Sequence, residues 1–233
     1  MCDLTEQFCR AILEHTLRPS NELIIINNGS TDRTPYYLAK KQKDYPDRLI
    51  VITNTQNRGF SAGMNQGLAI ASGEFLVCAS NDIWFYHADW LEMLIAPLRI
   101  NKRRLAGARY INFNELTRVD GQIIPYLEGF MLAFHKQFLK DVGFFDEAFF
   151  PAFYEDVDLS WRAMRHGYEL VQVDVLPVQH LCGKSALNNA EKFHLVGDLG
   201  VPEASRKNQA YFQDKIRRGD DSPYYPKGEA CSE

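Results

Sequence analysis

The chain has 233 residues, of which 45% are hydrophobic and 24% charged, a composition that is typical of a soluble globular protein. Its formal net charge of −4 argues against a nucleic-acid-binding protein, because such proteins present a basic face. The five cysteines show no CxxC spacing, so neither a disulfide framework nor a zinc site is expected. No apolar run reaches the ~18 residues of a membrane-spanning helix, and the acid-containing start MCDLTEQFCR does not resemble a signal peptide. We therefore expect a cytoplasmic protein, with attachment to a membrane surface left open.

The first part of the chain alternates helical and strand-like patterns. In chain order, the residues predict a helix at 3–17, a strand at 22–28, a helix at 35–44, a strand at 48–54, a loop and helix at 57–73, and a strand at 74–80. The β-branched run ELIIINN at 22–28 is of the kind that a parallel sheet buries on both faces. Thr34 is the expected N-cap of the second helix, because Pro35 suits the first helical position.

The remainder of the chain continues this alternation. It predicts a helix near 88–99, strands near 105–112 and 128–134, a short helix at 135–143, a helix from about 155 that ends at Gly167, and a long strand at 168–180. We expect one α/β domain over residues 1–186, with a mainly parallel sheet and helices on both faces. We expect the tail at 187–233 to be helical and to pack on the domain or on a partner.

Ligands in open α/β sheets collect at the carboxyl ends of the strands, and polar residues stand at several of these ends. Asp82 follows a strand directly, where its carboxylate suits a divalent cation, although an Asx-turn is an equally simple explanation. His180 ends the long strand and is a candidate second ligand, although most such histidines are only hydrogen-bonded. The amides of Asn27 and Asn28 suit a nucleobase or ribose, and Gly59 permits a close approach of phosphate to a helix N-terminus.

The segment FYEDVDLSWRAMRHGY (153–168) crowds three carboxylates, Glu155, Asp156 and Asp158, into four positions. Acids in the first turn of a helix are stabilised by about 0.3–1 kcal/mol each, which accounts for Glu155 or Asp158 without any function. Asp156 lies between like charges and beside an aromatic cluster, conditions that raise the pKa of a carboxyl group and suit a general base.

Four stretches, in this order, resemble the family 2 glycosyltransferases of the GT-A (Rossmann-like) fold, especially the rhamnosyltransferase-like branch. They are ELIIINNGSTDRT, NRGFSAGMNQGLAIASGEFLVCASND, VGFFDEAFFPAFYEDVDLSWRAMRHGY and VLPVQHLCGKS, and the resemblance covers about residues 3–186. It implies an inverting transfer of a sugar from a nucleotide-diphosphate donor, assisted by Mg²⁺ or Mn²⁺, in glycan or polysaccharide synthesis.

The resemblance also implies roles for individual residues. Asp156 is the implied catalytic base and Glu155 its neighbour on the acceptor side, while Asp82 and His180 are the implied metal ligands. The residues implied to bind the nucleotide are Asn27, Asn28, Asn57, Gly59, Asn65, Ser80 and Asn81. UDP- or dTDP-sugars are the favoured donors, and the acceptor is a glycan, a lipid-linked molecule or a protein.

Three departures from the family pattern leave a second function open. Asn27 and Ser80 stand where the family usually has acids, which leaves fewer negative ligands for a metal. The family also opens with a central strand, whereas this sequence opens at the helix that follows it. We therefore expect a gap in the sheet, which the tail, a partner chain or a second copy could fill, since unpaired buried backbone is costly. The alternative to an enzyme is a catalytically silent module that binds a nucleotide, a glycan or a partner subunit; a nucleotidyltransferase of related fold is more remote.

Overall fold

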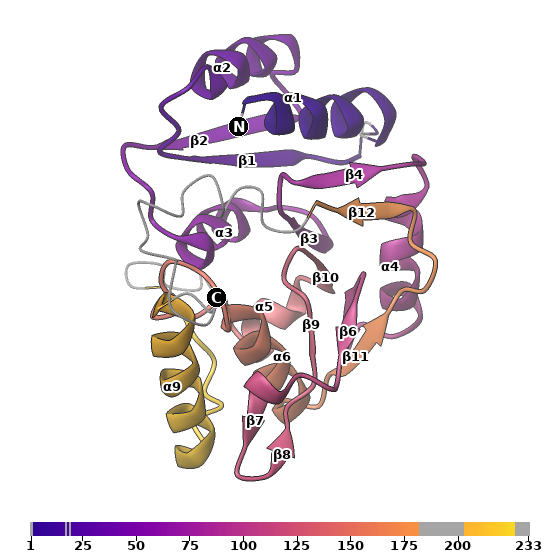
Figure 1. Ribbon diagram of the computed structural model, residues 1–233. Helices are drawn as coiled ribbons and strands as arrows, with labels where there is room; N and C mark the ends of the chain where they lie inside the picture. The colour runs from indigo at the N-terminus through magenta and orange to yellow at the C-terminus, as the bar shows by residue number, and fades with distance from the viewer. Residues whose placement is uncertain (1, 17, 19, 182–202, 227–233) are drawn as a thin grey trace.

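The structure is a computed structural model that describes residues 2–16, 18, 20–181 and 203–226, and it confirms the alternating α/β pattern (Figure 1). The first part of the chain contains α1 (Cys2–Arg10), the π-helical turn η1 (Ala11–Thr16), β1 (Leu23–Asn28), α2 (Thr34–Asp44), β2 (Leu49–Asn54), α3 (Phe60–Ile70) and β3 (Phe75–Ala79). Each of these elements begins and ends within a few residues of its predicted bounds.

The second part begins with β4 (Ile83–Phe85), α4 (Trp90–Ile100), β5 (Arg104–Gly107), β6 (Tyr110–Ile111), the 3₁₀ turn η2 (Glu115–Thr117), β7 (Arg118–Val119), β8 (Gln122–Ile123) and β9 (Tyr126–Leu127). It ends with β10 (Met131–His135), α5 (Gln137–Asp141), α6 (Glu155–Arg165), β11 (Glu169–Gln172), β12 (Val178–His180) and α9 (Glu203–Arg218). The helix predicted from about 155 is α6, and Gly167 follows it with a φ of 76°.

The strands form a mixed sheet whose main part has the order β11-β5-β10-β3. β10 is antiparallel to both of its neighbours, β3 and β5, while β5 and β11 are parallel. β1 and β2 form a separate parallel pair, with Leu23 opposite Leu49 and Asn28 opposite Asn54. The predicted parallel character therefore holds for β1–β2 and β5–β11, and β10 departs from it.

Helices cover both faces of the β1–β2 pair, as predicted (Figure 1). Ile25 packs toward α1 and α2, in a cluster with Cys9 and Leu38. On the opposite face, Ile24 and Ile26 lie beside α3, whose glycines permit a close approach of helix to strand. The alternation of side chains along β1 thus places the strand inside a layer of helices on each side.

Two expectations are corrected. The strand predicted at 168–180 is divided into β11 and β12, because Val175 has a φ of 59° and Pro177 cannot donate to a sheet ladder. The second piece, β12, pairs with β4 instead of continuing beside β5. Thr34 is also not the cap of α2: it is the first residue of the helix, and Asp32 accepts a hydrogen bond from the Thr34 N–H at 2.9 Å.

The expected gap in the sheet is present between β1 and β3. Among the described residues, β1 pairs only with β2 and β3 pairs only with β10, so that each strand has one open edge. The run Leu23–Ile26 is accordingly only half-buried, although its composition predicts burial on both faces. The missing neighbour along the sheet edge is the physical reason.

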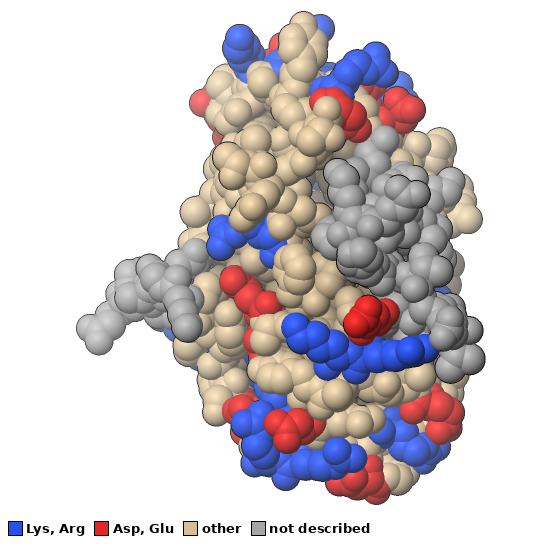
Figure 2. Space-filling model, turned by 60° about the vertical axis from the view of Figure 1, so that its left-hand side comes forward, with Lys and Arg blue, Asp and Glu red and all other residues tan. Residues whose placement is uncertain are grey.

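Two general features concern the distribution of charge on the surface and the length of the helices. Lys and Arg side chains are interspersed with Asp and Glu side chains over the lower half of the face in Figure 2, which leaves no extended patch of one sign there. Within the described part of the chain, none of the helices combines the length and the apolar character that crossing a bilayer requires.

Candidate functional site

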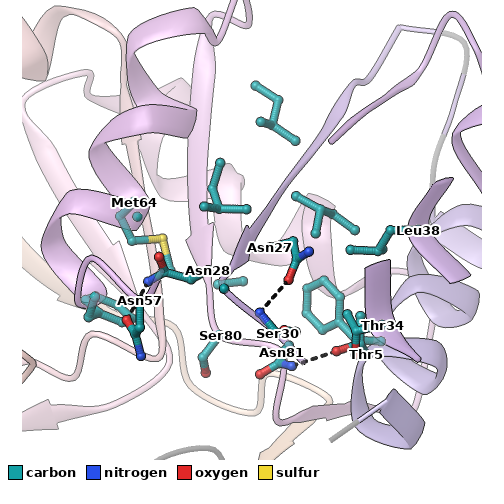
Figure 3. Close-up of a pocket in the computed structure, with 18 of the residues that line it drawn as sticks. Thr5, Asn27, Asn28, Ser30, Thr34, Leu38, Asn57, Met64, Ser80 and Asn81 are labelled. Carbon is teal, nitrogen blue, oxygen red and sulfur yellow. Dashed lines mark hydrogen bonds between the residues drawn. The ribbon is translucent and has the colours of Figure 1, made fainter. Parts of the chain in front are cut away.

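A cavity of about 830 Å³ occupies the gap between β1 and β3. Its interior is apolar, with Phe8 from α1, Leu38 from α2 and Met64 from α3 among the residues that surround it. In Figure 3, Met64 and Leu38 border the cavity on opposite sides, and a row of polar side chains follows the end where the strands terminate. The cavity is therefore an apolar slot that opens onto a polar rim at the carboxyl edge of the sheet.

Asn28 organises one side of this rim. Its Nδ2 donates to Asn57 Oδ1 and to the Gly59 carbonyl oxygen, both at 2.9 Å. Its Oδ1 accepts from the Arg58 N–H at 3.0 Å and from Asn54 Nδ2 at 3.1 Å. Because all its hydrogen-bonding capacity is used, Asn28 joins two loops together, and Asn57 strengthens this joint by accepting from the Gly59 N–H at 2.9 Å.

Gly59 is the residue that precedes α3, and its backbone requires glycine. It has a φ of 86°, and a Cβ atom there would lie 2.8 Å from Phe150 Cδ2 and 3.0 Å from the Pro151 carbonyl oxygen. The next residue, Phe60, donates its N–H to that same carbonyl at 2.8 Å. The start of α3 is thereby fixed against the loop that leads to α6.

Asn27 presents an unsatisfied amide to the cavity. Its side chain is 3% exposed, and its Oδ1 accepts from the Ser30 N–H at 3.2 Å. Its Nδ2 has no hydrogen-bond partner among the described residues, which is unusual for a buried donor. In Figure 3 this amide projects between β1 and the side chains of Thr34 and Leu38. Asn81, on the other side of the cavity, donates from Nδ2 to Thr5 Oγ1 at 3.0 Å.

The structure brings Asp82 and His180 together, from the loop after β3 and from the end of β12. His180 Nε2 lies 3.3 Å from Asp82 Oδ1, and Ser80 Oγ donates to the same oxygen at 2.7 Å. Burial opposes ionisation of Asp82, but the hydrogen bonds from His180 and Ser80 outweigh it and lower the pKa of this carboxyl group. Asp82 is thus a buried carboxylate that stays ionised at neutral pH.

Glu155 and Asp156 begin α6 and have different environments. Glu155 is 6% exposed, and its burial together with the neighbouring Asp156 charge raises its pKa well above the usual range. Asp156 is partly exposed; Oδ2 accepts from the Gly129 N–H at 2.8 Å and Oδ1 from the Val157 N–H at 2.9 Å. Burial raises the pKa of Asp156 to about 6, against the effect of these two hydrogen bonds.

The dipeptide Gly129–Phe130 connects the two acidic centres. The Gly129 N–H holds Asp156, while the Phe130 ring stacks on His180 with a centroid distance of 4.3 Å and an interplanar angle of 8°. The Phe130 carbonyl oxygen accepts from the Ser80 N–H at 2.9 Å. A single short segment before β10 thus contacts both the partly exposed Asp156 carboxylate and the His180 ring of the Asp82–His180 pair.

The structure does not bring Asn65 to this rim. Asn65 is 1% exposed and bonds to the Phe145 backbone in both directions, with N···O distances of 2.9 and 3.0 Å, and to Glu147 Oε1 at 3.0 Å. Its amide therefore holds α3 to the loop after α5. Sequence reasoning also missed Gly129, whose lack of a side chain matters because a Cβ would lie 3.0 Å from Asp156 Cβ. A glycine after Glu128 at the start of a strand was the only signal.

Comparisons with known proteins identify the family and the fold of the chain. The family model for glycosyl transferase family 2 matches residues 4–193. A poly-β-1,6-N-acetyl-D-glucosamine synthase of Staphylococcus epidermidis is 28% identical over 174 residues, which cover 65% of this chain and 40% of that protein. The enzyme of the same name from Staphylococcus aureus strain COL is 27% identical over 171 residues, with 64% and 40% covered. The chain thus spans about two-fifths of the length of these relatives.

Two solved structures share the fold. A mannosyltransferase from Pyrobaculum calidifontis, in complex with GDP-Man and Mn²⁺, superposes with a TM-score of 0.63 at 22% identity and covers 91% of this chain and 66% of its own. GalNAc-T7 with UDP, GalNAc and Mn²⁺ superposes with a TM-score of 0.60 at 14% identity, covering 94% and 48%. The expected GT-A fold is confirmed by these likenesses, and the family match extends over most of the sequence. The chain belongs to glycosyl transferase family 2.

Proposed function

We propose that this chain transfers a sugar from a nucleotide-diphosphate donor to an acceptor hydroxyl, with inversion at the anomeric carbon, in the synthesis of a glycan or polysaccharide. One observation carries the proposal: a single dipeptide, Gly129–Phe130, holds both the Asp156 carboxylate and the Asp82–His180 pair. A general base and an anion-neutralising pair, both contacted by adjacent residues of one segment, are what a displacement of a diphosphate requires.

The donor nucleotide is assigned to the polar rim of the cavity. The unpartnered Nδ2 of Asn27 is a donor for a carbonyl of the base or a hydroxyl of the ribose. The start of α3 at Gly59 favours the negative charge of a phosphate group. UDP- and dTDP-sugars are the donors that we favour; the solved neighbours are complexes with GDP-Man and with UDP.

Asp82 and His180 would hold the divalent cation, Mg²⁺ or Mn²⁺. The ionised carboxylate and the imidazole are both ligands that Mn²⁺ accepts, and the two solved neighbours contain Mn²⁺. Among the described residues no group of three or more His, Cys, Asp or Glu side chains could hold a metal ion alone. The remaining ligands would therefore be diphosphate oxygens and water, and a bound cation would offset the negative charge of the departing diphosphate.

Asp156 is assigned as the general base. It is partly exposed, its two backbone hydrogen bonds fix its orientation, and its pKa of about 6 is close to neutral pH. Asp156 accepts the proton of the acceptor hydroxyl while the hydroxyl oxygen attacks the anomeric carbon, and the diphosphate leaves from the opposite side. Burial and the neighbouring Asp156 charge raise the pKa of Glu155, which is assigned as the neighbour of the base on the acceptor side.

The decisive experiment compares Asp156→Asn with Asp214→Asn, an exposed carboxylate on α9. Loss of a general base reduces turnover by roughly 10²- to 10⁴-fold, so Asp156→Asn should lose sugar transfer and keep its cooperative unfolding transition. Asp214→Asn should behave as the original chain. If Asp156→Asn keeps its turnover within about twofold of that of the original chain, the base assignment is excluded, because the loss of a general base slows turnover far more than twofold.

A silent binding module is the second candidate, favoured by the open slot beside β1 and by the amide Asn27 at a position that is usually acidic. Calorimetric titration with UDP, dTDP and GDP, each with and without Mn²⁺, separates the two functions. Metal-dependent binding accompanied by turnover of a donor sugar supports the enzyme. Metal-independent binding without turnover of any donor in a nucleotide-sugar panel supports the silent module.

We also propose that an extended peptide segment completes the sheet between β1 and β3, in place of the partner chain or second copy that the sequence left open. Residues Ile24 and Ile26 of β1, and Val77 and Ala79 of β3, direct their backbone groups away from β2 and β10. None of these backbone groups bonds to another described residue. An apolar ligand alone would leave these donors and acceptors unpaired, whereas a strand pairs them on both sides.

The segment would join the amino end of α1. The Cys2 N–H donates to Asp32 Oδ2 at 3.0 Å, which places the start of α1 at the carboxyl end of β1. A strand parallel to β1 ends at that same edge, and α1 would then form the crossover into β1, as in a βαβ unit. The acceptor remains a glycan, a lipid-linked molecule or a protein, and a cytoplasmic or membrane-peripheral location remains a prediction.

A further inference from the structure

The loop at 146–154, here called the delivery loop, has an unusual backbone just before the acidic pair. Phe153 and Tyr154 have φ values of 81° and 74°, in the left-handed region that residues with a side chain rarely adopt. Two such residues in succession persist only where the surroundings hold them. Since they precede Glu155 and Asp156 directly, their conformation sets the direction in which α6 begins and Asp156 points.

Helix α9 supplies part of those surroundings through Asn208. Asn208 is 1% exposed, and its Nδ2 donates to the carbonyl oxygens of Ala152 and Phe153 at 2.9 and 3.0 Å. Both hydrogens of this amide are therefore used on consecutive carbonyls of the delivery loop. No other asparagine or glutamine side chain in the described residues bonds to two consecutive backbone carbonyls of this loop.

Lys215, two turns further along α9, joins the beginning of the delivery loop to the first turn of α6. Its Nζ lies 3.0 Å from Asp146 Oδ2, at the beginning of the loop, and 2.7 Å from Asp158 Oδ1, in the first turn of α6. Lys215 is only 3% exposed, and its charge is paired with Asp146 and with Asp158, which Arg162 shares. Tyr211 adds a hydrogen bond from its hydroxyl to Asp146 Oδ2 at 3.0 Å.

An apolar contact completes the attachment. Phe212, which is fully buried, lies between Asn208 and Lys215 along the same face of α9. Its ring is 5.8 Å from the Tyr154 ring and 6.4 Å from the Trp161 ring, centroid to centroid. The opposite face of α9 carries the exposed Lys207 and Asp214. Asn208, Tyr211 and Lys215 therefore attach this face of α9 to the delivery loop and to the start of α6.

From these contacts we propose that α9 is a positioning element of the active site, in which Asn208 and Lys215 hold the delivery loop so that Asp156 meets the acceptor hydroxyl. This inference rests on the proposed function and assigns a task to the C-terminal part of the chain. Asn208 and Lys215 touch neither substrate nor reacting atoms, so they act through the loop. Their loss should change the rate of the chemical step more than the binding of the donor.

The charged and titratable groups around Asp156 influence its pKa, which the pH profile of kcat/KM would measure. Glu155 precedes it in α6, Glu128 approaches from the segment before β10, and Tyr126 and Tyr154 lie within electrostatic range. Glu128 is itself 3.5 Å from Arg109. None of these groups belongs to α9. A loosened delivery loop would admit water to Asp156 and bring its pKa down toward the usual range of an aspartate, since burial is the main cause of the increase.

The test uses Asn208→Ala with Lys207→Ala as its control, because Lys207 lies one residue earlier on the exposed face of α9. Asn208→Ala should lower kcat by roughly 10- to 100-fold, the effect of a misplaced reacting group, with the donor KM changed by less than about twofold. The acidic limb of kcat/KM should move to lower pH. Lys207→Ala should change none of these. Lys215→Met should reproduce the loss of kcat. If Lys215→Met fails to fold, the result for Asn208→Ala alone tests the positioning role of α9.

Two results would overturn the inference. One is an Asn208→Ala variant whose kcat and acidic limb match those of the original chain. The other is a loss of activity that follows the melting temperature alone and leaves the acidic limb in place. If the original chain transfers no sugar, the proposed function fails, and NMR titration of the Asp156 carboxyl carbon still decides. A lower pKa in Asn208→Ala then supports the loop attachment, and an unchanged pKa excludes it.

Discussion

At the scale of single residues, the two acids at the start of α6 show how neighbouring groups acquire different tasks. Both have raised pKa values, mainly through burial, but Asp156 has two backbone donors and partial exposure, whereas Glu155 Oε2 has no partner among the described residues. The sequence indicated the crowding of the acids and the raised pKa. It could not indicate the Gly129 N–H, because that donor comes from a segment 27 residues away.

The raised pKa of Asp156 predicts a pH dependence of catalysis. A general base acts in its deprotonated form, so activity is full above the pKa and falls as the pH drops through about 6. Below this value kcat/KM should decrease about tenfold per pH unit, which an ordinary aspartate would show only below about pH 4. A profile of kcat/KM that is flat down to about pH 5 would exclude a base with this pKa. Asp82, whose pKa is lowered, should stay ionised throughout.

Gly59 provides a second prediction, with a matched control in Gly121. Both have nearly the same positive φ, 86° and 87°, but a Cβ at Gly59 would meet Phe150 at 2.8 Å, whereas nothing lies within 4 Å of one at Gly121. Gly121→Ala should cost only the backbone strain of about 1–3 kcal/mol in urea unfolding. Gly59→Ala should cost more and should weaken binding of UDP, because the start of α3 must move. Equal effects of the two substitutions on UDP affinity would contradict a phosphate site at Gly59.

At the scale of elements, the sequence predicts the segments better than their partners. Periodicity identifies β10 as a strand, but it contains no information that β10 runs antiparallel between β3 and β5. The segment 168–180 has a strand-like composition throughout. The strand is nevertheless interrupted, by the positive φ of Val175 and by Pro177, which has no N–H to donate. The sequence predicts a packed, helical tail but not which face of α9 packs, because Asn208 and Lys215 are polar residues that a periodicity argument assigns to solvent.

The buried ion pair of α6 predicts a large loss of stability when its arginine is replaced. Arg162 has no exposed surface; its Nε donates to Asp158 Oδ2 at 2.8 Å, and its guanidinium also donates to the Val142 and Phe144 carbonyl oxygens. Asp158 is thus held by Arg162 and Lys215, which favours a structural role for its carboxylate. Arg162→Met should cost about 3–5 kcal/mol of unfolding free energy, because it leaves buried acceptors without their partner.

The control for this prediction is Arg118→Met, which removes an ion pair with Glu115 of similar length, 2.7 Å, on the surface. Water screens that pair, so Arg118→Met should cost much less unfolding free energy than Arg162→Met. Urea denaturation of the two variants measures the difference directly. Equal costs would mean that the Arg162 network adds no stability beyond that of a surface pair.

At the scale of the whole molecule, the cavity between β1 and β3 separates two parts that the helices hold together. α1 reaches across one face, with Phe8 packed 5.6 Å from Phe85 of β4. α3 reaches across the other, with Leu68 in the cluster around β3 and its glycines against Ile24 and Ile26. The gap was predictable from the order of the motifs. Its width and its apolar lining were not, because they depend on both helices keeping their places without the strand.

The proposed strand leads to a prediction for the whole fold. An apolar, β-branched segment as long as β1, which has six residues, is fused ahead of Met1 through a short flexible turn. If it pairs with both open edges, the amide hydrogens of Ile24 and Val77 should exchange more slowly, the urea midpoint should rise, and UDP should bind more tightly at the completed rim. The gain in stability follows because the backbone groups of both strands gain hydrogen-bond partners and the half-buried side chains of β1 are removed from water.

A control fusion with the same apolar residues interrupted by alternate prolines distinguishes pairing from simple hydrophobic contact. Proline cannot donate to a ladder, so this fusion should leave the exchange rates of Ile24 and Val77 unchanged. Equal protection by both fusions would contradict strand addition. Light scattering of the unmodified chain tests the remaining occupant: a dimer in which both amides are already protected would mean that a second copy supplies the strand. A monomer with fast exchange at both positions, slowed only by the proline-free fusion, supports pairing of both open edges with a strand joined to the amino end of α1, because α1 would then form the crossover into β1.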